Sequence, residues 1–177
     1  MVAPITATKK VTLGRDTWWI IPALAAPAAP AITDINSVSG LNVSGFTLGE
    51  QDGFASDTGK TALPRLLTET TVTESLEPTT FSLPTFRFVF DPQAAGAAND
   101  KKAWALLKDG FVGFIVRRQN IVNSVSDACV AGQFVDNAPI IGSVGTPKMT
   151  GTGADAIYVF DVDFGITGTP KFNVAAV

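Results

Sequence analysis

The chain has no histidine, a single cysteine (Cys129) and few charged residues, which make up 16% of its 177 positions. Histidine is the usual general base near neutral pH and the commonest metal ligand. Its absence excludes Ser-His-Asp triads, Cys-His dyads and His-ligated zinc sites. One cysteine cannot form an intramolecular disulfide. We therefore expect a protein that works through its shape and contacts, not an enzyme, with no cofactor and no metal site.

The bulk composition favours one folded domain over residues 1–177. Hydrophobic residues make up 46% of the chain, and the formal net charge is −3. This length and apolar content allow one sizeable core. A surface that grips nucleic acid needs clustered Lys and Arg, and the negative balance argues against one.

The N-terminal region imitates a secretion signal, because basic residues precede an apolar run at 18–26. Asp16 directly before the run and Pro22 within it argue against that interpretation. No apolar run reaches the ~20 residues needed to span a bilayer. We expect no membrane anchor.

Strand patterns dominate the chain. Phe86, Phe88 and Phe90 alternate with polar or smaller residues, which is typical of a strand with one buried face. In 157–164 the aromatic and aliphatic residues share one face, and Asp161 and Asp163 lie on the other. Further strands are expected within 11–21, 32–46 (two short strands with a turn), 63–77 (with one face in water), 111–118 and 133–141.

One helix is expected at about 99–108, capped by Asn99 or Asp100 and stopped at Gly110. The predicted fold is therefore mainly β, an antiparallel sandwich or barrel-like domain with one packed α-helix. Two segments fall outside this pattern: a proline-stiffened extended arm at 22–31 and a polar loop of 14 residues at 47–60.

Several motifs favour structural over chemical interpretations. Residues 53–61 resemble a phosphate-binding P-loop, but the glycine spacing is one residue too long and no helix follows. The Asp161 and Asp163 carboxylates could hold a metal or act as an acid/base pair, although a solvated strand face is the commoner arrangement. Cys129, between Ala128 and Val130, is expected to be a small buried hydrophobe.

Two residue pairs have similar alternatives. Adjacent strand residues point to opposite faces, so of Trp18 and Trp19 we expect one in the core and the other covering an interface. Arg117 and Arg118 end an apolar strand, which favours a solvated terminus or an ion pair over a phosphate contact.

Three stretches carry a family resemblance. They are the opening Leu13-Gly14-Arg15-Asp16 before an apolar strand, the Ala/Pro arm that runs through Pro30 into Ile32-Thr33-Asp34-Ile35-Asn36, and the strand end Val116-Arg117-Arg118. In this order the chain resembles the major tail tube proteins of phages with long, non-contractile tails (siphovirus type), especially those of actinobacterial hosts. Asp34 stands where that family usually has Glu.

The resemblance implies six-membered rings that stack into a tail tube, each subunit giving four strands to an inner barrel. Roughly 24 strands at ~4.8 Å spacing and ~40° tilt enclose a circle about 48 Å across. The tube would hold a tape-measure protein, pass double-stranded DNA without binding it tightly, and end in terminator and distal tail proteins. Assembly in the host cytoplasm and a place in the virion tail follow.

Two sets of residues are candidates for these contacts. Acidic groups facing the lumen would keep DNA sliding, because each cation on a phosphate adds affinity; the candidates are Glu69, Glu74, Asp161 and Asp163. The 47–60 loop and the 22–31 arm are assigned to contacts between rings, with the loop candidates Glu50, Gln51, Asp52, Gly53, Phe54, Asp57 and Lys60.

Two other functions fit the composition. The first is a monomeric β-sandwich binding module with an aromatic groove near Trp18 or Trp19. The second is another tail component of similar fold, such as a tail terminator. Rings or tubes in the electron microscope would favour the tail tube, a persistent monomer the module, and a single unstacked ring the terminator.

Overall fold

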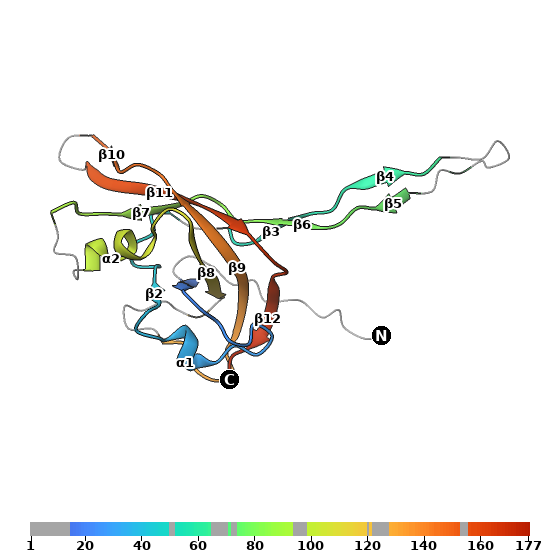
Figure 1. Cartoon of the computed structure of the whole chain (residues 1–177), viewed down its shortest axis with the longest axis horizontal. Coiled ribbons are helices and arrows are strands. Elements are labelled where there is room, and N and C mark those ends of the chain that lie inside the picture. Colours follow the sequence, from blue (N-terminus) through green and yellow to red (C-terminus); the bar gives the residue numbers. More distant parts are fainter. Residues whose placement is uncertain are drawn as a thin grey trace, which may run out of the picture.

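The computed structural model describes residues 15–49, 52–64, 71, 74–93, 99–119, 121, 128–152 and 156–177, with the backbone alone at 99 and 100. Within these residues the chain is mainly β and its strands pair antiparallel, which confirms the predicted fold class. Figure 1 shows a barrel-like body and a long β-hairpin that projects from it.

The body contains eight strands, with order β10-β11-β9-β8-β1-β2 and with β7 on β11 and β12 on β9. The long strand β9 organises them, because β8 pairs along one edge while β12 and β11 share the other. The strands are β1 (Thr17–Ile21), β2 (Leu41–Asn42), β7 (Phe86–Val89), β8 (Phe111–Arg118), β9 (Phe134–Val144), β10 (Lys148–Thr150), β11 (Ile157–Ile166) and β12 (Lys171–Ala175).

The segment after β2 closes this sheet on itself. The Val43 amide donates to the Trp18 carbonyl at 2.9 Å, next to the β1–β2 pair. Further on, the Leu48 amide donates to the Arg87 carbonyl of β7 at 2.8 Å, and the Val89 amide donates to the Phe46 carbonyl at 2.8 Å. Residues 43–48 therefore join β1 to β7, and the body has few open edges to expose.

The inward side chains form a single aromatic-rich core. Phe86 and Phe88 are fully buried and Phe90 nearly so, as their alternation predicts. They pack with inward residues of the facing strands, including Trp18, Ile20, Ile115, Ala138, Ile140, Phe160, Val162 and Phe164. Burying such side chains contributes roughly 1.5–3 kcal/mol each, and this term holds the barrel together.

A second apolar cluster covers the outer face of β1, β8 and β9. Trp19 and Ile21 point there, and the short helix α1 (Ile32–Ile35) covers them through Ile35. Both Trp18 and Trp19 are only 3% exposed, so the expectation that one of them covers an interface is wrong: one sits in each cluster. Cys129 is a free thiol in the second cluster, as predicted.

The predicted helix is α2 (Asn99–Leu106), which packs against the body. Ala103 and Leu107 are buried, and the Trp104 ring lies 5.0 Å from Phe160 and 5.2 Å from Phe90 between centroids. The helix ends before the expected stop at Gly110. That glycine, with φ +76°, lies in the turn into β8, where the Phe111 amide donates to the Lys108 carbonyl at 2.9 Å.

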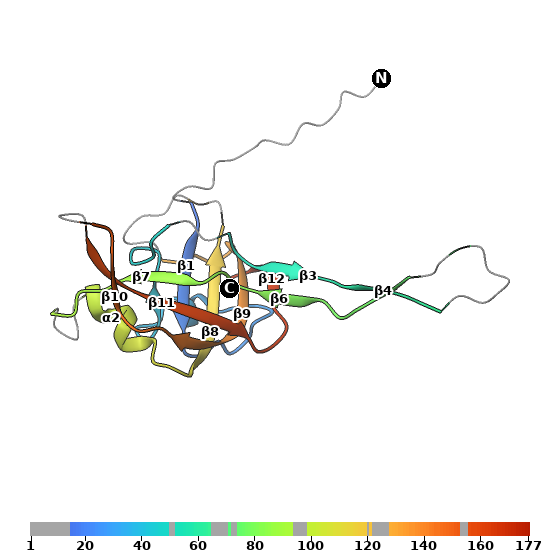
Figure 2. The ribbon, with the colours of Figure 1, turned by 90° about the horizontal axis from the view of Figure 1, so that it is seen from above.

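The projecting hairpin is here called the arm, and its described residues are 55–64, 71 and 74–82. It is built from two short strand pairs: β3 (Ala55–Asp57) with β6 (Thr80–Ser82), and β4 (Lys60–Ala62) with β5 (Glu74–Leu76). Both views show it leaving the body (Figures 1 and 2). The prediction of a polar loop at 47–60 is therefore wrong for residues 55–60, which form one side of a hairpin. Exposed β-pairing between 55–62 and 74–82 replaces the loop.

Two other sequence expectations change. Residues 32–46 hold helix α1 and the two-residue β2 instead of two short strands. The Ala/Pro segment 22–31 lies on the body: Asn137 Nδ2 donates to the Pro27 carbonyl at 2.9 Å, and the Val177 amide to the Pro30 carbonyl at 3.0 Å. Of the 63–77 segment, residues 74–76 are a strand, and 65–70, 72 and 73 lie outside the described residues.

Candidate assembly surfaces

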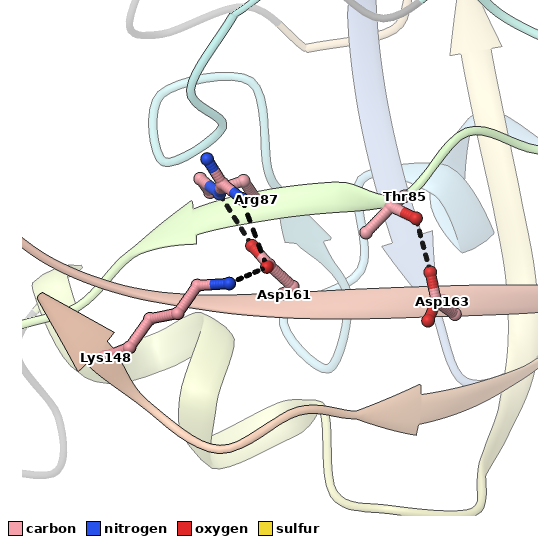
Figure 3. Close-up of polar contacts among 5 residues, drawn as sticks. All are labelled: Thr85, Arg87, Lys148, Asp161 and Asp163. Carbon is pink, nitrogen blue, oxygen red and sulfur yellow. Dashed lines mark hydrogen bonds and ion pairs between the residues drawn. The ribbon is translucent and has the colours of Figure 1, made fainter. Parts of the chain in front are cut away.

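A polar face covers β7, β10 and β11 on the outside of the barrel. The register places Arg87 opposite Asp161, one residue from the inward pair Phe86 and Val162. Successive side chains of a strand point to opposite faces, so the neighbours of buried strand residues point outward. Arg87 and Asp161, drawn in Figure 3, therefore lie on the outer face because Phe86 and Val162 beside them are buried.

Asp161 is held by two cations. Arg87 donates from Nε to Asp161 Oδ1 at 2.7 Å and from Nη2 to Oδ2 at 3.2 Å, and Lys148 Nζ lies 2.5 Å from Oδ2 (Figure 3). The hydrogen bonds from Arg87, then from Lys148, lower the pKa of Asp161 to about 2. The same contact with Asp161 raises the pKa of Arg87. The carboxylate is therefore charged and bonded, and unsuited to proton transfer.

Asp163 lies two residues further along the same face. It accepts a hydrogen bond from the Thr85 hydroxyl at 2.5 Å (Figure 3). With Arg87, Lys148 and Asp161, it makes a face of two cations and two carboxylates, whose formal charges cancel. The face is hollowed by a shallow cavity of about 420 Å³, lined by Leu48, Gly49, Thr85, Arg87, Thr150 and Asp161.

The four predicted lumen residues are not brought together. Asp161 and Asp163 share the polar face, whereas Glu74 lies on the arm, 3.6 Å from Lys60 in an exposed ion pair. Glu69 lies outside the described residues. Among described residues, no group of three or more Asp, Glu, Cys or His side chains could hold a metal ion.

The predicted inter-ring residues map to the arm and its base. Asp57 is on β3 and Lys60 on β4, and Asp52, Gly53 and Phe54 lead into β3. Glu50 and Gln51 lie outside the described residues.

The arm is exposed and carries apolar side chains into solvent. Every described residue of β3, β4 and β5 is exposed, and Leu76 and Leu63 retain 70% and 46% of their accessible surface. A two-stranded hairpin is marginally stable by itself in water. Its exposed leucines and open strand edges therefore make the arm a surface suited to contact another molecule.

Sequence reasoning missed Arg87 and Lys148. Arg87 had a usable signal, because it stands between two phenylalanines whose burial was predicted, beside a strand with paired aspartates. Lys148 had none, since its approach to Asp161 depends on the β10–β11 pairing. Arg117 forms an ion pair with Asp16, one of its predicted alternatives, whereas Arg118 is 1% exposed and not a solvated terminus.

Comparison with known proteins assigns a family to this architecture. A family model described as phage tail tube protein matches residues 4–177. No curated protein matches the chain. In the described part of the chain, no helix is long and apolar enough to cross a membrane. Because the family match covers nearly the whole sequence, this chain belongs to the phage tail tube protein family.

Proposed function

We propose that this chain forms six-membered rings that stack into the tail tube of a phage with a long, non-contractile tail, and that the lumen conducts the genomic DNA. Family membership makes the chain a structural component of the virion tail and not an enzyme. The hexamer, the stacking, the DNA passage and an actinobacterial host are the finer parts of the proposal, and they rest on the resemblance described above.

The observation that carries the proposal is the exposed arm. It projects from a body whose own core is complete, and it buries almost nothing within its own chain (Figures 1 and 2). A stacked tube requires contacts that run from ring to ring, and a long hairpin reaching beyond the barrel meets that need. We assign Asp57, Lys60 and Leu76 to this contact.

We assign the polar face of β7, β10 and β11 to the lumen. DNA gains affinity from each Lys or Arg that neutralises a phosphate and releases counterions. Arg87 and Lys148 both form ion pairs with Asp161, and this carboxylate competes with phosphates for them. A face with balanced, internally paired charge lets the duplex slide, and Asp161 and Asp163 remain the lumen candidates among the described residues.

The remaining partners follow from the tube. A tape-measure protein would occupy the lumen before DNA does, and a tail terminator and distal tail proteins would close the two ends, with assembly in the host cytoplasm. The competing binding module loses its supporting feature, because a groove built on Trp18 or Trp19 needs exposed rings and both are buried.

The test is electron microscopy of the purified chain at high concentration, with and without the arm. Replacing residues 56–81 by Asn-Gly joins the paired Ala55 and Ser82 through a two-residue turn. The full chain should form tubes, and the shortened chain should keep the thermal stability of the barrel without forming tubes. A full chain that stays monomeric contradicts the proposal, and one that stops at a single ring supports the terminator instead.

A further inference from the structure

The strand beside the base of the arm carries a β-bulge. On β12, Lys171 pairs with Asn137 of β9 and Val174 pairs with Val135, so one strand advances three residues while the other advances two. Asn173, inside the irregularity, has φ +52°. Asparagine tolerates this left-handed conformation far better than β-branched residues do.

A buried carboxylate fixes the bulge. Asp136, only 7% exposed, accepts the Asn173 amide hydrogen at 2.8 Å on Oδ1. Its other oxygen, Oδ2, accepts a hydrogen bond from Gln119 Nε2. Charge-assisted hydrogen bonds to a buried carboxylate are among the stronger ones in proteins, so Asp136 holds the backbone of Asn173 in its unusual conformation.

The bulge places the Phe172 ring against the arm. Its centroid lies 5.5 Å from Phe54, which leads into β3, and 5.7 Å from Phe81 on the returning strand β6. Phe54 in turn lies 6.1 Å from Trp18 in the barrel core. Bulges commonly redirect a side chain in this way. One ring of β12 therefore contacts both sides of the hairpin at its base.

A second contact lies at the base of the arm, between Gly53 and Arg117. Gly53 has φ +95°, and a Cβ there would lie 1.9 Å from Arg117 Nη1. The Arg117 guanidinium sits over the Trp18 ring at 5.2 Å from the centroid and donates to Asp16 Oδ2 from Nε at 3.0 Å. The absence of a side chain at 53 lets the chain turn into the arm directly on this guanidinium.

We propose that the β12 bulge sets the direction in which the arm leaves the body, with Phe172 as the positioning residue and Asp136 and Asn173 as its support. The arm has no core of its own, so its direction depends on the contacts at its base. The consequence for ring stacking rests on the proposed function; the positioning of the arm does not.

The experiment measures one distance in the full chain by double electron–electron resonance. Spin labels at Ser75→Cys on the arm and Ser143→Cys on the body report the direction of the arm, in a Cys129→Ala background. Phe172→Ala should replace a narrow distance distribution with a broad one. Phe134→Ala, which removes an aromatic ring of similar exposure on neighbouring β9, should leave it narrow.

Two substitutions at Asn173 distinguish the effect of the bulge from the effect of the Phe172 ring. Asn173→Gly accepts the positive φ and should keep the narrow distribution, whereas Asn173→Val resists it and should broaden the distribution. Thermal unfolding of each variant verifies that the barrel is intact. A distribution that stays narrow in both Phe172→Ala and Asn173→Val overturns the proposal.

Electron microscopy of tube formation by the same variants distinguishes the positioning of the arm from its proposed role in ring stacking. If the distribution broadens and tubes are lost, both the positioning and the stacking role of the arm are supported. If the distribution broadens and tubes still form, the positioning stands and the stacking role of the arm is contradicted.

Discussion

Arg87 and Asp161 are 74 positions apart in sequence, yet they face each other across β7 and β11 and form a two-point ion pair, with Nε 2.7 Å from Oδ1. Lys148 joins the pair through the second carboxylate oxygen at 2.5 Å. The Asp161 carboxylate therefore pairs with two cations on the polar face. Substitution of Asp161 would remove the ion-pair partner that Arg87 and Lys148 share.

Asp161→Asn should turn this face into a DNA-binding surface. Arg87 and Lys148 would become available to phosphates, each adding about 0.9 to the salt dependence of the affinity. Fluorescence anisotropy with a labelled DNA duplex at several salt concentrations measures the affinity and its salt dependence. Asp57→Asn is the control, because it changes the net charge by the same amount but on the arm. This variant should bind the duplex as weakly as the parent does. Equal binding by the two variants would contradict the prediction.

Acid should weaken the Asp161 ion pairs. The pKa of Asp161 is lowered from 3.8 to about 2 in the folded chain, chiefly by Arg87 and then by Lys148. A depressed pKa means that the stabilisation is present above 3.8 and is lost as the pH falls through about 2. Surface pairs contribute about 0.2–1 kcal/mol. Urea unfolding should therefore separate the parent from Asp161→Asn near neutral pH, and the difference should shrink as the pH falls toward and below about 2; a constant difference would refute this.

Gly113→Ala should destabilise the barrel by about 1–3 kcal/mol, because overpacking forces the backbone apart. A Cβ at 113 would lie 2.4 Å from the Ile21 carbonyl oxygen across the β1–β8 pair. Gly45→Ala is the matched control, since a Cβ there meets nothing within 4 Å. Chemical denaturation should show a lower midpoint for Gly113→Ala alone, and equal midpoints would count against the close packing of β1 on β8.

Arg118→Met should cost about 1–3 kcal/mol, because the buried Thr17 hydroxyl loses its donor together with two less buried acceptors. The Arg118 guanidinium donates to the Ala128 carbonyl and Gln133 Oε1, both at 3.1 Å, and to Thr17 Oγ1 at 3.0 Å. Lys102→Met, at an exposed position on α2, should be close to neutral. Thermal unfolding of both variants is the measurement, and a neutral Arg118→Met would show that these bonds contribute little.

Much of the fold could be predicted because its signals are local. Phe86, Phe88 and Phe90 specify an inward face by alternation alone. Local signals failed where long-range pairing decides. The polar stretch before Lys60 has the composition of a loop, yet it forms strands because 74–82 lies beside it.

The candidate site divides in the same way. Asp161 and Asp163 could be found on one outward face from sequence, because neighbours of buried residues point outward. Their partners Arg87 and Lys148 could not, since nothing in either segment specifies which strand lies next to it. Arg118 and Trp19 were also misjudged, because α1 and the segments around 22–31 and 128–133 cover the face on which they lie.

The sequence by itself determined that this protein is mainly β, that it lacks the groups for histidine-dependent catalysis, and which side of several strands faces the core. These properties depend on composition and on a two-residue period, both of which act within a few positions of each residue. Only the tertiary structure decided that the sheet closes through 43–48, that the described residues of 55–64 and 74–82 leave the body as an arm, and that Asp161 pairs with both Arg87 and Lys148. Each of these depends on strand register between distant segments, which the whole barrel selects when it buries its core.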